Sequence, residues 1–520
     1  MDTTHTVAGL LANSESTIHL DNSSTTAQQL AADGTYVAAH LRDLGLRHGD
    51  RVAVWAPNSL GYLRLLAAAA VGRFVLVSVN TRFSLDEAAS IVNRSGALVV
   101  VTSRPEDLDA SGLTDCQIIP IARFSDETSD LPLGGDTPNL HLTDHSHQQP
   151  QPDDPFVVFT TSGTTSQPKL VLHTQRSIHD HARDVAGLFG YTSSARTLVA
   201  LPLCGVFGLA SLAAPLAGGS TVWLPSQFDA ETTASDIERH RITIMHGPDD
   251  MFHRMMATER DLSSIRLAGY ARFNPSLGDI VDRAAARGIT LTGLYGMSEV
   301  QALFMLQDPT SAPSERSMGG GALVSRHAGA RVVDPASGEE QPVGEAGELQ
   351  LHGPSLFVGY LQHGGAGIDL DLTESAFVTD AEGVRWFTTG DLAQYEPNGT
   401  ISYLTRMGDV LRLGGFLVSP AEIEEVLVGH PSIGEAQVVT VARPEGVRPV
   451  AVVIAASDGS AHTEIDQGDV ISYCTERLAQ FKVPIAVLKV DEFPVALSAN
   501  GTKIQRNVLQ TLAADALGGT

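Results

Sequence analysis

A hydroxyl-rich loop has the residue types that most directly suggest chemistry. It reads Thr160-Thr161-Ser162-Gly163-Thr164-Thr165-Ser166-Gln167-Pro168-Lys169 and follows an apolar run, Phe156–Phe159, that predicts a short buried strand. Small hydroxyls and backbone amides at the end of a strand are good donors to phosphate oxygens, and Gly163 lets a ligand approach the backbone closely. By itself such a stretch is either a solvated turn or a polyphosphate site, and because the loop lacks the Gly-Lys-Ser/Thr ending of a Walker loop, an ordinary P-loop is disfavoured.

Further motifs place carboxylate, aromatic and cationic side chains at expected turns. They are Tyr295-Gly296-Met297-Ser298-Glu299, Gly347-Glu348-Leu349 with Gly353-Pro354 and Gly359-Tyr360, Trp386-Phe387-Thr388-Thr389-Gly390-Asp391, Arg406 with Gly414-Gly415, and Asn500-Gly501-Thr502-Lys503-Ile504. Taken singly, each is most simply a turn, a hairpin or a buried aromatic residue. Ser419 with Glu422 three residues later is typical of a capping box at a helix start.

The charge of the chain limits its partners. It has 60 acidic and 34 basic residues, a formal charge of −26. A surface of this sign repels nucleic-acid backbones and anionic lipids, so we expect neither a nucleic-acid nor a membrane partner. Three widely spaced cysteines predict neither a disulfide framework nor a zinc motif, and the amino-terminal residues lack a basic leader, so we expect a cytoplasmic protein.

One polar stretch contains three histidines. His141, His145 and His147 lie between Ser125 and Asp154, where Asp, Pro and His are frequent. With no other candidate ligand close in the sequence, this stretch predicts a solvated loop rather than a metal site.

The elements that must position these motifs alternate along the chain. From Arg51 to about Thr102, strand-like runs alternate with Ala/Leu-rich helical stretches, which predicts a parallel or mixed α/β sheet. A second α/β stretch is expected from Phe156 to Gly321, and short strands with Gly and Pro turns from Ala330 to Leu404 predict a small β-rich subdomain. The composition changes again after Arg406, and the remaining residues are enough for a separate small α+β domain.

In their order and spacing the motifs resemble those of the adenylate-forming superfamily, which includes acyl-CoA synthetases, adenylation domains of peptide synthetases and luciferases. The resemblance extends from Gly49-Asp50-Arg51-Val52 and Asn80-Thr81-Arg82 to Lys503, nearly the whole chain. It implies an α/β fold with a large N-terminal domain of stacked α/β sheets and a small β-rich subdomain, residues 1–405. A mobile C-terminal α+β lid, residues 406–520, would follow.

The resemblance also implies a two-step reaction. A carboxylate attacks the α-phosphate of Mg-ATP, releases pyrophosphate and leaves an acyl-adenylate, from which a thiol, commonly that of coenzyme A, displaces AMP. Such phosphoryl chemistry depends on positioning and on charge neutralisation more than on covalent help from the protein.

Individual roles follow from the same resemblance. Ser298 would donate to the α-phosphate, Glu299 would bind Mg²⁺, and Lys503 would bridge the substrate carboxylate and the α-phosphate, which makes these three the predicted catalytic residues. Tyr295 would offer its ring to adenine, and Asp391 would accept hydrogen bonds from both ribose hydroxyls. The predicted ATP- and AMP-binding set is Thr161, Ser162, Gly163, Thr164, Thr165, Lys169, Gly269, Tyr270, Tyr295, Gly296, Met297, Ser298, Asp391, Arg406 and Lys503.

Two glycine positions are implied in the second step. Gly414 and Gly415 would line a channel for a pantetheine arm, where side chains would obstruct. Relatives rotate the lid between the two steps about a position that is commonly Asp or Lys and is Gly408 here, so we expect a hinge near Gly408.

The chain departs from the family where the acid would bind. The predicted acyl pocket comprises Cys204, Gly205, Phe207 and Leu294, and small residues stand where relatives often carry an aromatic or His gate. This stretch lacks the Asp that holds the ammonium group in amino-acid-activating relatives, which disfavours an amino-acid substrate. If Tyr270 or Leu294 points inward, the pocket is short and favours a small or flat acid; if both point outward, they are ordinary packing, and the sequence leaves both arrangements open.

The leading expectation is an ATP-dependent ligase that activates a small or aromatic carboxylic acid and transfers it to coenzyme A. The alternatives are a ligase that loads a carrier-protein thiol and a diazotase-like enzyme that adenylates a non-carboxylate acid such as nitrite. A binding protein without activity is disfavoured because Lys503, Glu299 and Asp391 are all present. A homodimer is the default expectation for the assembly.

Overall fold

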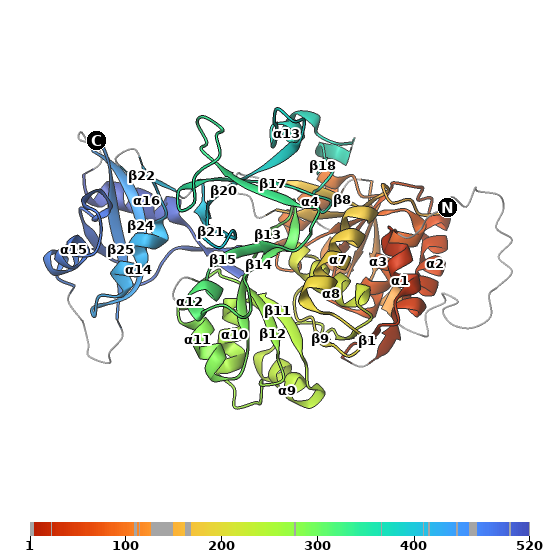
Figure 1. Ribbon diagram of the computed structural model, residues 1–520. Helices are drawn as coiled ribbons and strands as arrows, with labels where there is room; N and C mark the ends of the chain where they lie inside the picture. Colours follow the sequence, from red (N-terminus) through yellow and green to blue (C-terminus); the bar gives the residue numbers. More distant parts are fainter. Residues whose placement is uncertain are drawn as a thin grey trace.

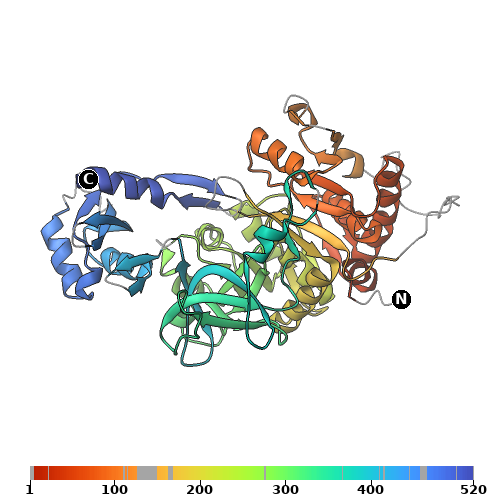
Figure 2. The same cartoon turned by 90° about the horizontal axis from the view of Figure 1, so that it is seen from above.

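The computed structural model describes residues 5–518 except for short gaps. The gaps are residues 22, 109–111, 114, 126–148, 162–167, 275–276, 366, 409, 414–415, 444–445, 457–464 and 499–500. The chain forms a large lobe and a smaller C-terminal lobe that lie side by side in both views (Figures 1 and 2).

The first sheet of the large lobe is mostly parallel. Its strands follow the order β18-β8-β7-β4-β3-β5-β6. The strands are β3 (Arg51–Trp55), β4 (Val75–Ser78), β5 (Val99–Thr102), β6 (Gln117–Pro120), β7 (Pro155–Thr160), β8 (Leu170–Thr174) and β18 (Gly359–Tyr360). The helices between them are α3 (Leu60–Gly72), α4 (Leu85–Ser95), α5 (Pro105–Leu108) and α6 (Ala122–Ser125). Strands β4 and β5 are buried at every position, as expected where helices cover both faces of a parallel sheet.

Small residues allow helices to pack closely at the amino-terminal end of the lobe. Helices α1 (Val7–Asn13) and α2 (Ala27–Asp43) precede β3, which is the earliest strand of this sheet in the chain, and α2 packs on α3. A Cβ at Gly34 of α2 would lie only 2.7 Å from the Ala67 backbone of α3, so the two helices touch backbone to backbone.

The second sheet runs through the centre of the molecule and changes character along its length (Figure 1). Its order is β16-β17-β20-β21-β15-β14-β13-β12-β11-β9-β10-β1-β2, with β19 paired to β20. From β13 to β1 the strands pair in parallel, whereas from β13 to β16 they pair antiparallel. A parallel α/β unit and a β-rich unit are therefore joined in one continuous sheet.

The elements of the parallel half are β1 (Thr17–His19), β2 (Ser24–Thr26), α7 (Gln175–Phe189), β9 (Arg196–Leu198), α8 (Val206–Ala217), β10 (Thr221–Trp223), α9 (Ala230–His240), β11 (Ile244–Pro248), α10 (Asp249–Met256), β12 (Leu267–Ala271), α11 (Ile280–Ala286) and β13 (Leu291–Met297). Those of the antiparallel half are β14 (Gln301–Leu306), α12 (Pro313–Arg316), β15 (Gly319–Leu323), β16 (Gly329–Val333), β17 (Ala346–His352), η2 (His363–Gly365), α13 (Leu370–Glu374), β19 (Phe377–Thr379), β20 (Arg385–Tyr395) and β21 (Ile401–Arg406).

The predicted α/β class is confirmed, but the two sheets do not follow the order of the expected α/β stretches along the chain. Strands β7 and β8 start the stretch assigned to the second unit, yet β7 pairs with β4 and belongs to the first sheet. Conversely, β1 pairs with β10 and, together with β2, forms one end of the second sheet. Strand partners are chosen by tertiary packing, which can join segments that are distant in sequence.

The smaller lobe begins immediately after the last strand of the large sheet. Strand β21 ends at Arg406, and β22 belongs to a separate two-stranded sheet. The elements of this lobe are β22 (Leu411–Leu413), β23 (Phe416–Val418), α14 (Pro420–Val428), β24 (Ile433–Arg443), β25 (Gly446–Ala455), α15 (Gln467–Thr475), η3 (Gln480–Lys482), β26 (Val487–Lys489), β27 (Val495–Ser498), β28 (Gly501–Ile504) and α16 (Arg506–Ala516). The capping box predicted at Ser419 and Glu422 is present at the start of α14. The domain boundary and the hinge at Gly408 remain predictions.

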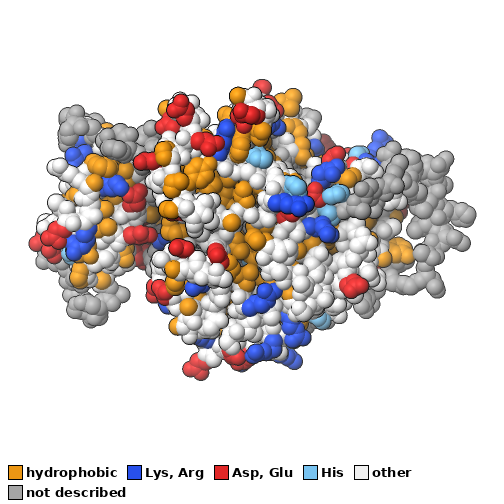
Figure 3. Space-filling model, viewed as in Figure 1, with side chains coloured by type: hydrophobic (Ala, Val, Ile, Leu, Met, Phe, Trp, Pro, Cys, Tyr) orange, Lys and Arg blue, Asp and Glu red, His pale blue; other side chains and the backbone are white. Residues whose placement is uncertain are grey.

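The surface carries both signs of charge. On the face shown in Figure 3, acidic side chains gather along the side of the smaller lobe that faces the large lobe. Among the described residues, no helix combines the length and the apolar character needed to cross a membrane.

Candidate active site

The predicted phosphate loop is held at its base by a β-hairpin. Strands β7 and β8 pair antiparallel with Thr160 opposite Leu170. The Thr161 amide donates to the Lys169 carbonyl at 3.0 Å, and the Lys169 amide donates to Thr161 Oγ1 at 3.1 Å. The two ends of the loop therefore meet, and the predicted residues Thr161 and Lys169 lie side by side at this opening, the loop mouth.

Lys169 is linked to Glu299 through a tyrosine. The Lys169 ammonium lies 4.5 Å from the centre of the Tyr360 ring, and the Tyr360 hydroxyl donates to Glu299 Oε1 at 3.0 Å. Strand β18, which carries Tyr360, pairs with β8 next to the loop, so the sheet itself brings these residues together. Glu299 is 5% exposed, and burial raises the pKa of its carboxyl, while Tyr360, Arg406 and Lys169 act in the opposite direction.

The turn that carries Ser298 and Glu299 is held from below by a histidine. It joins β13 to β14, and the Ser298 carbonyl accepts a hydrogen bond from His173 Nε2 at 2.7 Å. Because a carbonyl only accepts, His173 carries its proton on Nε2. Burial lowers the pKa of His173 to about 4, so the ring is neutral at pH 7.

The backbone after this turn is strained. Gln301 has φ of 69°, in the left-handed region that residues other than glycine rarely adopt. Its side-chain amide donates to the carbonyls of Ser177 and Ser355, which hold it in place. A Cβ at Gly296 would lie 2.5 Å from the Gln301 carbonyl oxygen, so only glycine fits opposite this distorted strand. Strain retained by surrounding bonds is typical of functional sites.

A buried carboxylate joins the same turn to two other strands. The Tyr295 hydroxyl donates to Asp391 Oδ2 at 2.6 Å, and Arg406 Nη1 lies 2.9 Å from Asp391 Oδ1. Asp391 and Arg406 are paired across β20 and β21, and Asp391 is 1% exposed. Burial and the nearby Asp391 charge raise the pKa of Tyr295 well above its usual value, so the phenol stays neutral. Partial desolvation lowers the pKa of Arg406, but the effect of Asp391 and the neighbouring Tyr295, Tyr403 and Glu299 outweighs it, so the guanidinium stays charged.

Three of the four residues predicted for the acyl pocket line one hollow. The residues around this small hollow are Asn80, Leu201, Pro202, Cys204, Gly205, Phe207 and Gly208. Asn58 fixes this segment by donating to the Leu201 carbonyl and accepting from the Leu203 amide. Burial raises the pKa of Cys204 to about 11, so its thiol is uncharged and packs as a small apolar group.

Tyr270 and Leu294 are packed into the core and do not line this hollow. Tyr270 is 1% exposed, and its hydroxyl donates to the Ser317 carbonyl at 3.0 Å. Leu294 is 7% exposed, and its Cδ2 would lie 3.0 Å from a Cβ at Gly269. The Gly269 amide donates to Nδ1 of the buried His246. Because Gly269 has no side chain, His246 and Leu294 can pack closely against its backbone. Neither large side chain shortens the described hollow.

Several predicted residues lie beyond these contacts. Ser162, Gly163, Thr164, Thr165, Gly414 and Gly415 lie outside the described residues. Lys503 is on β28 opposite Ala496 of β27, and its backbone is described but its side chain is not. Figure 2 shows the β27–β28 hairpin extending from the smaller lobe toward the large one.

Sequence reasoning missed two residues that organise the site. By its sequence pattern Gly359-Tyr360 indicates only a hairpin turn, and His173 belongs to no motif, although both residues contact the Ser298-Glu299 turn. A buried histidine and tyrosine beside polar loops were the available signals, but their partners are far away in sequence.

The arrangement brings together the chemistry of a nucleotide site. Hydroxyl and amide donors at the loop mouth, two cationic side chains and two buried carboxylates converge on the turn between β13 and β14. Asp391 can accept from a pair of hydroxyls, and the cationic groups can neutralise phosphate oxygens. The residues Thr161, Lys169, Tyr295, Ser298, Glu299, Asp391 and Arg406 are the predicted members that the fold places here.

Comparisons with known proteins agree with this geometry. The sequence profile described as "AMP-binding enzyme" matches residues 11–361, and that described as "AMP-binding enzyme C-terminal domain" matches residues 422–500. A feruloyl-CoA synthase from Amycolatopsis sp is 30% identical over 472 residues, which cover 88% of this chain and 88% of that protein. A 2-succinylbenzoate–CoA ligase from Bacillus licheniformis is 28% identical over 471 residues, 90% of this chain and 91% of that protein.

The fold has well-matched solved relatives. The crystal structure of ATP-bound MatB from Rhodopseudomonas palustris superposes with a TM-score of 0.80 at 24% identity, covering 98% of this chain and 99% of that chain. The overall fold is thus shared with that protein.

Proposed function

The chain belongs to the AMP-binding enzyme family, and we propose that it is an AMP-forming ligase that joins an aromatic carboxylic acid to coenzyme A. In the first step the carboxylate oxygen attacks the α-phosphorus of ATP, and pyrophosphate leaves. In the second step the thiol sulfur attacks the acyl carbon, and AMP leaves with the electron pair of the broken acyl–phosphate bond.

One observation carries the proposal at the level of the site. The Tyr295–Glu299 segment touches both the buried carboxylate Asp391, through Tyr295, and the mouth of the phosphate loop, through Glu299, Tyr360 and Lys169. One rigid turn thereby sets the distance between a group suited to ribose and groups suited to phosphates. A nucleotide that spans these two ends would have its α-phosphate beside Ser298.

The residue roles that we propose follow from this placement. Asp391 accepts from the ribose hydroxyls, and Arg406 exchanges part of its contact with Asp391 for the nucleotide. Thr161 and Lys169, with residues 162–165, bind the phosphates that leave. Lys503 approaches from the smaller lobe to neutralise the oxygens of the reacting carboxylate and α-phosphate, where negative charge increases in the transition state.

Magnesium fits the donor set at Glu299. The carboxylate is buried and lacks a salt-bridge partner in the part of the chain that the structure describes, and its oxygens are the ligands that Mg²⁺ prefers. Glu299 would hold the ion, which would neutralise phosphate charge when bound. Tyr360 orients the carboxylate through its hydrogen bond to Oε1, and Lys169 adds positive charge on the same side.

The hollow beside α8 supports an uncharged acyl body. Among the described residues that line it, none is ionised at pH 7, and Cys204 and Gly205 beside Phe207 are small. The curated relatives are named for ferulate and 2-succinylbenzoate, both of which contain an aromatic ring. An aromatic ring would stack or pack against Phe207 without needing a hydrogen-bond partner.

The test is ATP–pyrophosphate exchange with aromatic acids, short aliphatic acids and nitrite, followed by addition of coenzyme A or a carrier protein. We expect exchange with aromatic acids and formation of a CoA thioester. Exchange with nitrite alone, or acyl transfer to the carrier only, would identify one of the alternative enzymes. An absence of exchange with every acid would contradict the proposal.

The setting of the reaction follows from its substrates. ATP and coenzyme A are cytoplasmic, and Cys116, Cys204 and Cys474 are free thiols suited to a reducing compartment. We place the enzyme there, acting on a small-molecule acid. The homodimer remains a prediction that light scattering of the purified protein can check.

A further inference from the structure

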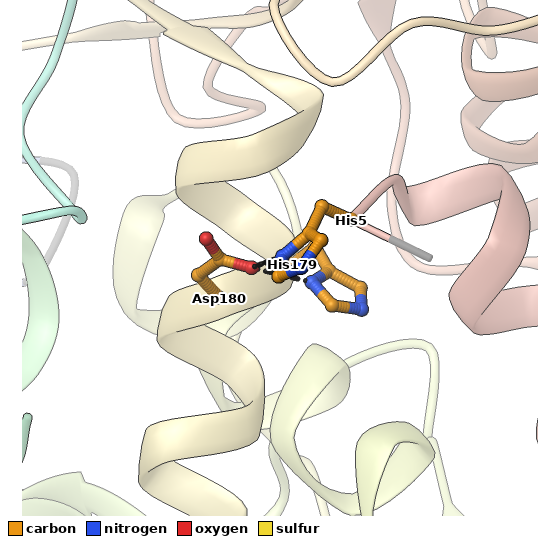
Figure 4. Close-up of side chains that lie close together, drawn as sticks. All are labelled: His5, His179 and Asp180. Atoms are coloured by element: carbon orange, nitrogen blue, oxygen red, sulfur yellow. Dashed lines mark hydrogen bonds and ion pairs between the residues drawn. The ribbon is translucent and has the colours of Figure 1, made fainter. Parts of the chain in front are cut away.

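Two histidines and an aspartate come together away from the candidate active site. His179 and Asp180 are adjacent in α7, and His5 immediately precedes Thr6, the N-cap of α1. Figure 4 shows the His5 ring, which comes from a different part of the chain, reaching across to the two α7 side chains. The ligand atoms of the three side chains all lie within 4.8 Å of one another.

The carboxylate is the centre of the cluster. His5 Nδ1 and His179 Nδ1 each lie 2.7 Å from the same oxygen, Asp180 Oδ1. The two rings meet edge to face with their centres 5.4 Å apart. Two nitrogens from separate segments thus converge on one oxygen. Helix α7 alone could not produce this arrangement, because His5 comes from the residue before the N-cap of α1.

The cluster is partly buried and open on one side. The exposed fractions of the side chains are 5% for His179, 21% for Asp180 and 48% for His5. His179 is therefore held by the core, Asp180 lies at the boundary, and His5 closes the group from the solvent side. Solvent can reach the cluster from that side, where water would complete a coordination shell.

We propose that His5, His179 and Asp180 form a binding site for a divalent transition-metal ion, with Zn²⁺ as the ion of choice. Two imidazole nitrogens and one carboxylate oxygen, with water in a fourth position, match the preferred four-coordinate geometry of zinc. Binding places the proton of each imidazole on Nε2, so that both Nδ1 lone pairs face the ion. The hydrogen bonds to Asp180 Oδ1 are then replaced by bonds to the metal.

The donor set distinguishes this site from the one at Glu299. Imidazole suits zinc, nickel, cobalt and copper, whereas Mg²⁺ prefers oxygen ligands and retains its water. The magnesium that accompanies ATP should therefore not compete at His5, His179 and Asp180. Two different ions would occupy two different places in the same lobe.

The site would join two segments that the reaction needs in place. Helix α1 packs on α7, and the Ala8 amide donates to the Gln175 side chain at the start of α7. Residues just before and inside α7 support the active-site turn, His173 at Ser298 and Ser177 at Gln301. An ion shared by His5 and α7 would fasten α1 to this helix, so its expected effect is on stability and not on the chemistry.

The test measures zinc binding by equilibrium dialysis of the untagged full-length protein in excess Mg²⁺. His141, His145 and His147 are first replaced by alanine together, because they could bind zinc independently. We expect one zinc per chain in this background, an increase in the melting temperature on zinc addition, and loss of both in His5→Ala and in Asp180→Asn. Removal of one ligand should weaken the affinity by more than about tenfold, since even residues that only orient a ligand cost 10–100-fold.

A matched control and a spectroscopic readout complete the experiment. His363 is an exposed histidine elsewhere on the large lobe, and His363→Ala should keep full zinc binding. Co²⁺ in place of zinc should show visible absorption that His5→Ala abolishes. If zinc binding is absent, or is unchanged in both His5→Ala and Asp180→Asn, the metal site is refuted. A lower melting temperature of His5→Ala without any zinc binding would also refute the metal site. It would indicate that His5 stabilises the fold only through its hydrogen bond to Asp180.

Discussion

Tyr295 donates a hydrogen bond of 2.6 Å to Asp391, a carboxylate that is 1% exposed and whose other oxygen faces Arg406. The two residues are 96 positions apart in the chain and belong to different strands of one sheet. The Tyr295 phenol donates to one oxygen of this carboxylate, and the charged Arg406 guanidinium lies beside the other. In the proposed complex, ribose hydroxyls would take the place of the Tyr295 hydroxyl at this carboxylate, so that binding would exchange one donor for others.

Tyr295→Phe and Asp391→Asn should therefore have different effects. Tyr295→Phe removes a donor to a buried charge and should lower the free energy of unfolding by about 1–3 kcal/mol, while AMP binding is kept or improved. Asp391→Asn should weaken AMP binding by more than about tenfold, since hydrogen bonds to charged groups are worth about 1.5–3 kcal/mol. Calorimetric titration with AMP and thermal melts of both variants measure this. Equal loss of AMP affinity in the two variants would contradict the exchange.

Lys503→Ala should separate the two half-reactions. The lysine is proposed to act only on the oxygens of the first step, so pyrophosphate exchange should fall by more than about a hundredfold, as for loss of a preorganised charge. Thioester formation from preformed acyl-adenylate should be largely retained. Lys489→Ala is the matched control, because it removes another lysine from the same lobe. Similar losses in both half-reactions would rule out the specific role of Lys503.

Gly408→Pro should affect the opposite half-reaction. A proline fixes φ near −65° and restricts the residue before it, so a large rotation of the smaller lobe about this position would be blocked. We expect adenylation to persist and thioester formation to fall. Gly408→Ala is the control, since a Cβ there meets nothing within 4 Å. Full thioester formation by Gly408→Pro would show that the hinge lies elsewhere.

Gly205→Leu should change the choice of acid. Gly205 lines the hollow, and its φ of −99° is accessible to any residue, so a larger side chain can be added without backbone strain. Since one methylene in an apolar pocket is worth about 1–3 kcal/mol, kcat/KM for bulky aromatic acids should fall at least tenfold. The value for a short aliphatic acid should change little. Leu201→Val, a conservative change in the same wall, serves as control; an unchanged preference in Gly205→Leu would place the acyl group elsewhere.

Stability should fall steeply below pH 6.5 because His173, His181 and His246 are buried and neutral in the folded chain. Burial lowers the pKa of His173 to about 4 and of His246 to about 3 from the usual 6.5. The unfolded chain therefore binds protons at pH 5 that the folded chain refuses, and stability present above pH 6.5 is lost as the pH falls toward 4. Between pH 7 and 5 each histidine should cost about 2 kcal/mol.

Denaturant titrations at pH 7, 6 and 5 check this loss. His173→Gln offers an amide donor near the position of Nε2 but does not titrate, so its stability should depend less on pH than that of the parent. An identical pH dependence in the two proteins would mean that His173 is protonated in the folded state or exposed to solvent.

Local signals in the sequence predicted the elements around the site well. The apolar run Phe156–Phe159 is part of β7, the runs at Val52–Trp55 and Val75–Val77 are strands, and the capping box at Ser419 begins α14. These features depend on neighbouring residues and on the period of apolar side chains, which one sequence displays directly. The order of the motifs likewise identified the family, which the profile matches then showed.

Partners across the fold could not be inferred in this way. Whether Tyr270 and Leu294 enter the acyl pocket depended on which face of β12 and β13 packs against helices, and both proved to be core residues. Tyr360 beside Lys169 and Glu299, and His5 beside His179 and Asp180, are contacts between segments that no local pattern connects.

The sequence alone determined the residue types, the strands and turns that carry them, and the reaction class that their order implies. The tertiary structure decided which of these residues meet, because strand pairing and helix packing bring distant segments together only when the whole chain has folded. In this protein, tertiary packing placed the β7–β8 hairpin in the first sheet and brought Tyr295, Asp391 and Arg406 together. It also placed the small residues Cys204 and Gly205 around the hollow where the acid is expected to lie.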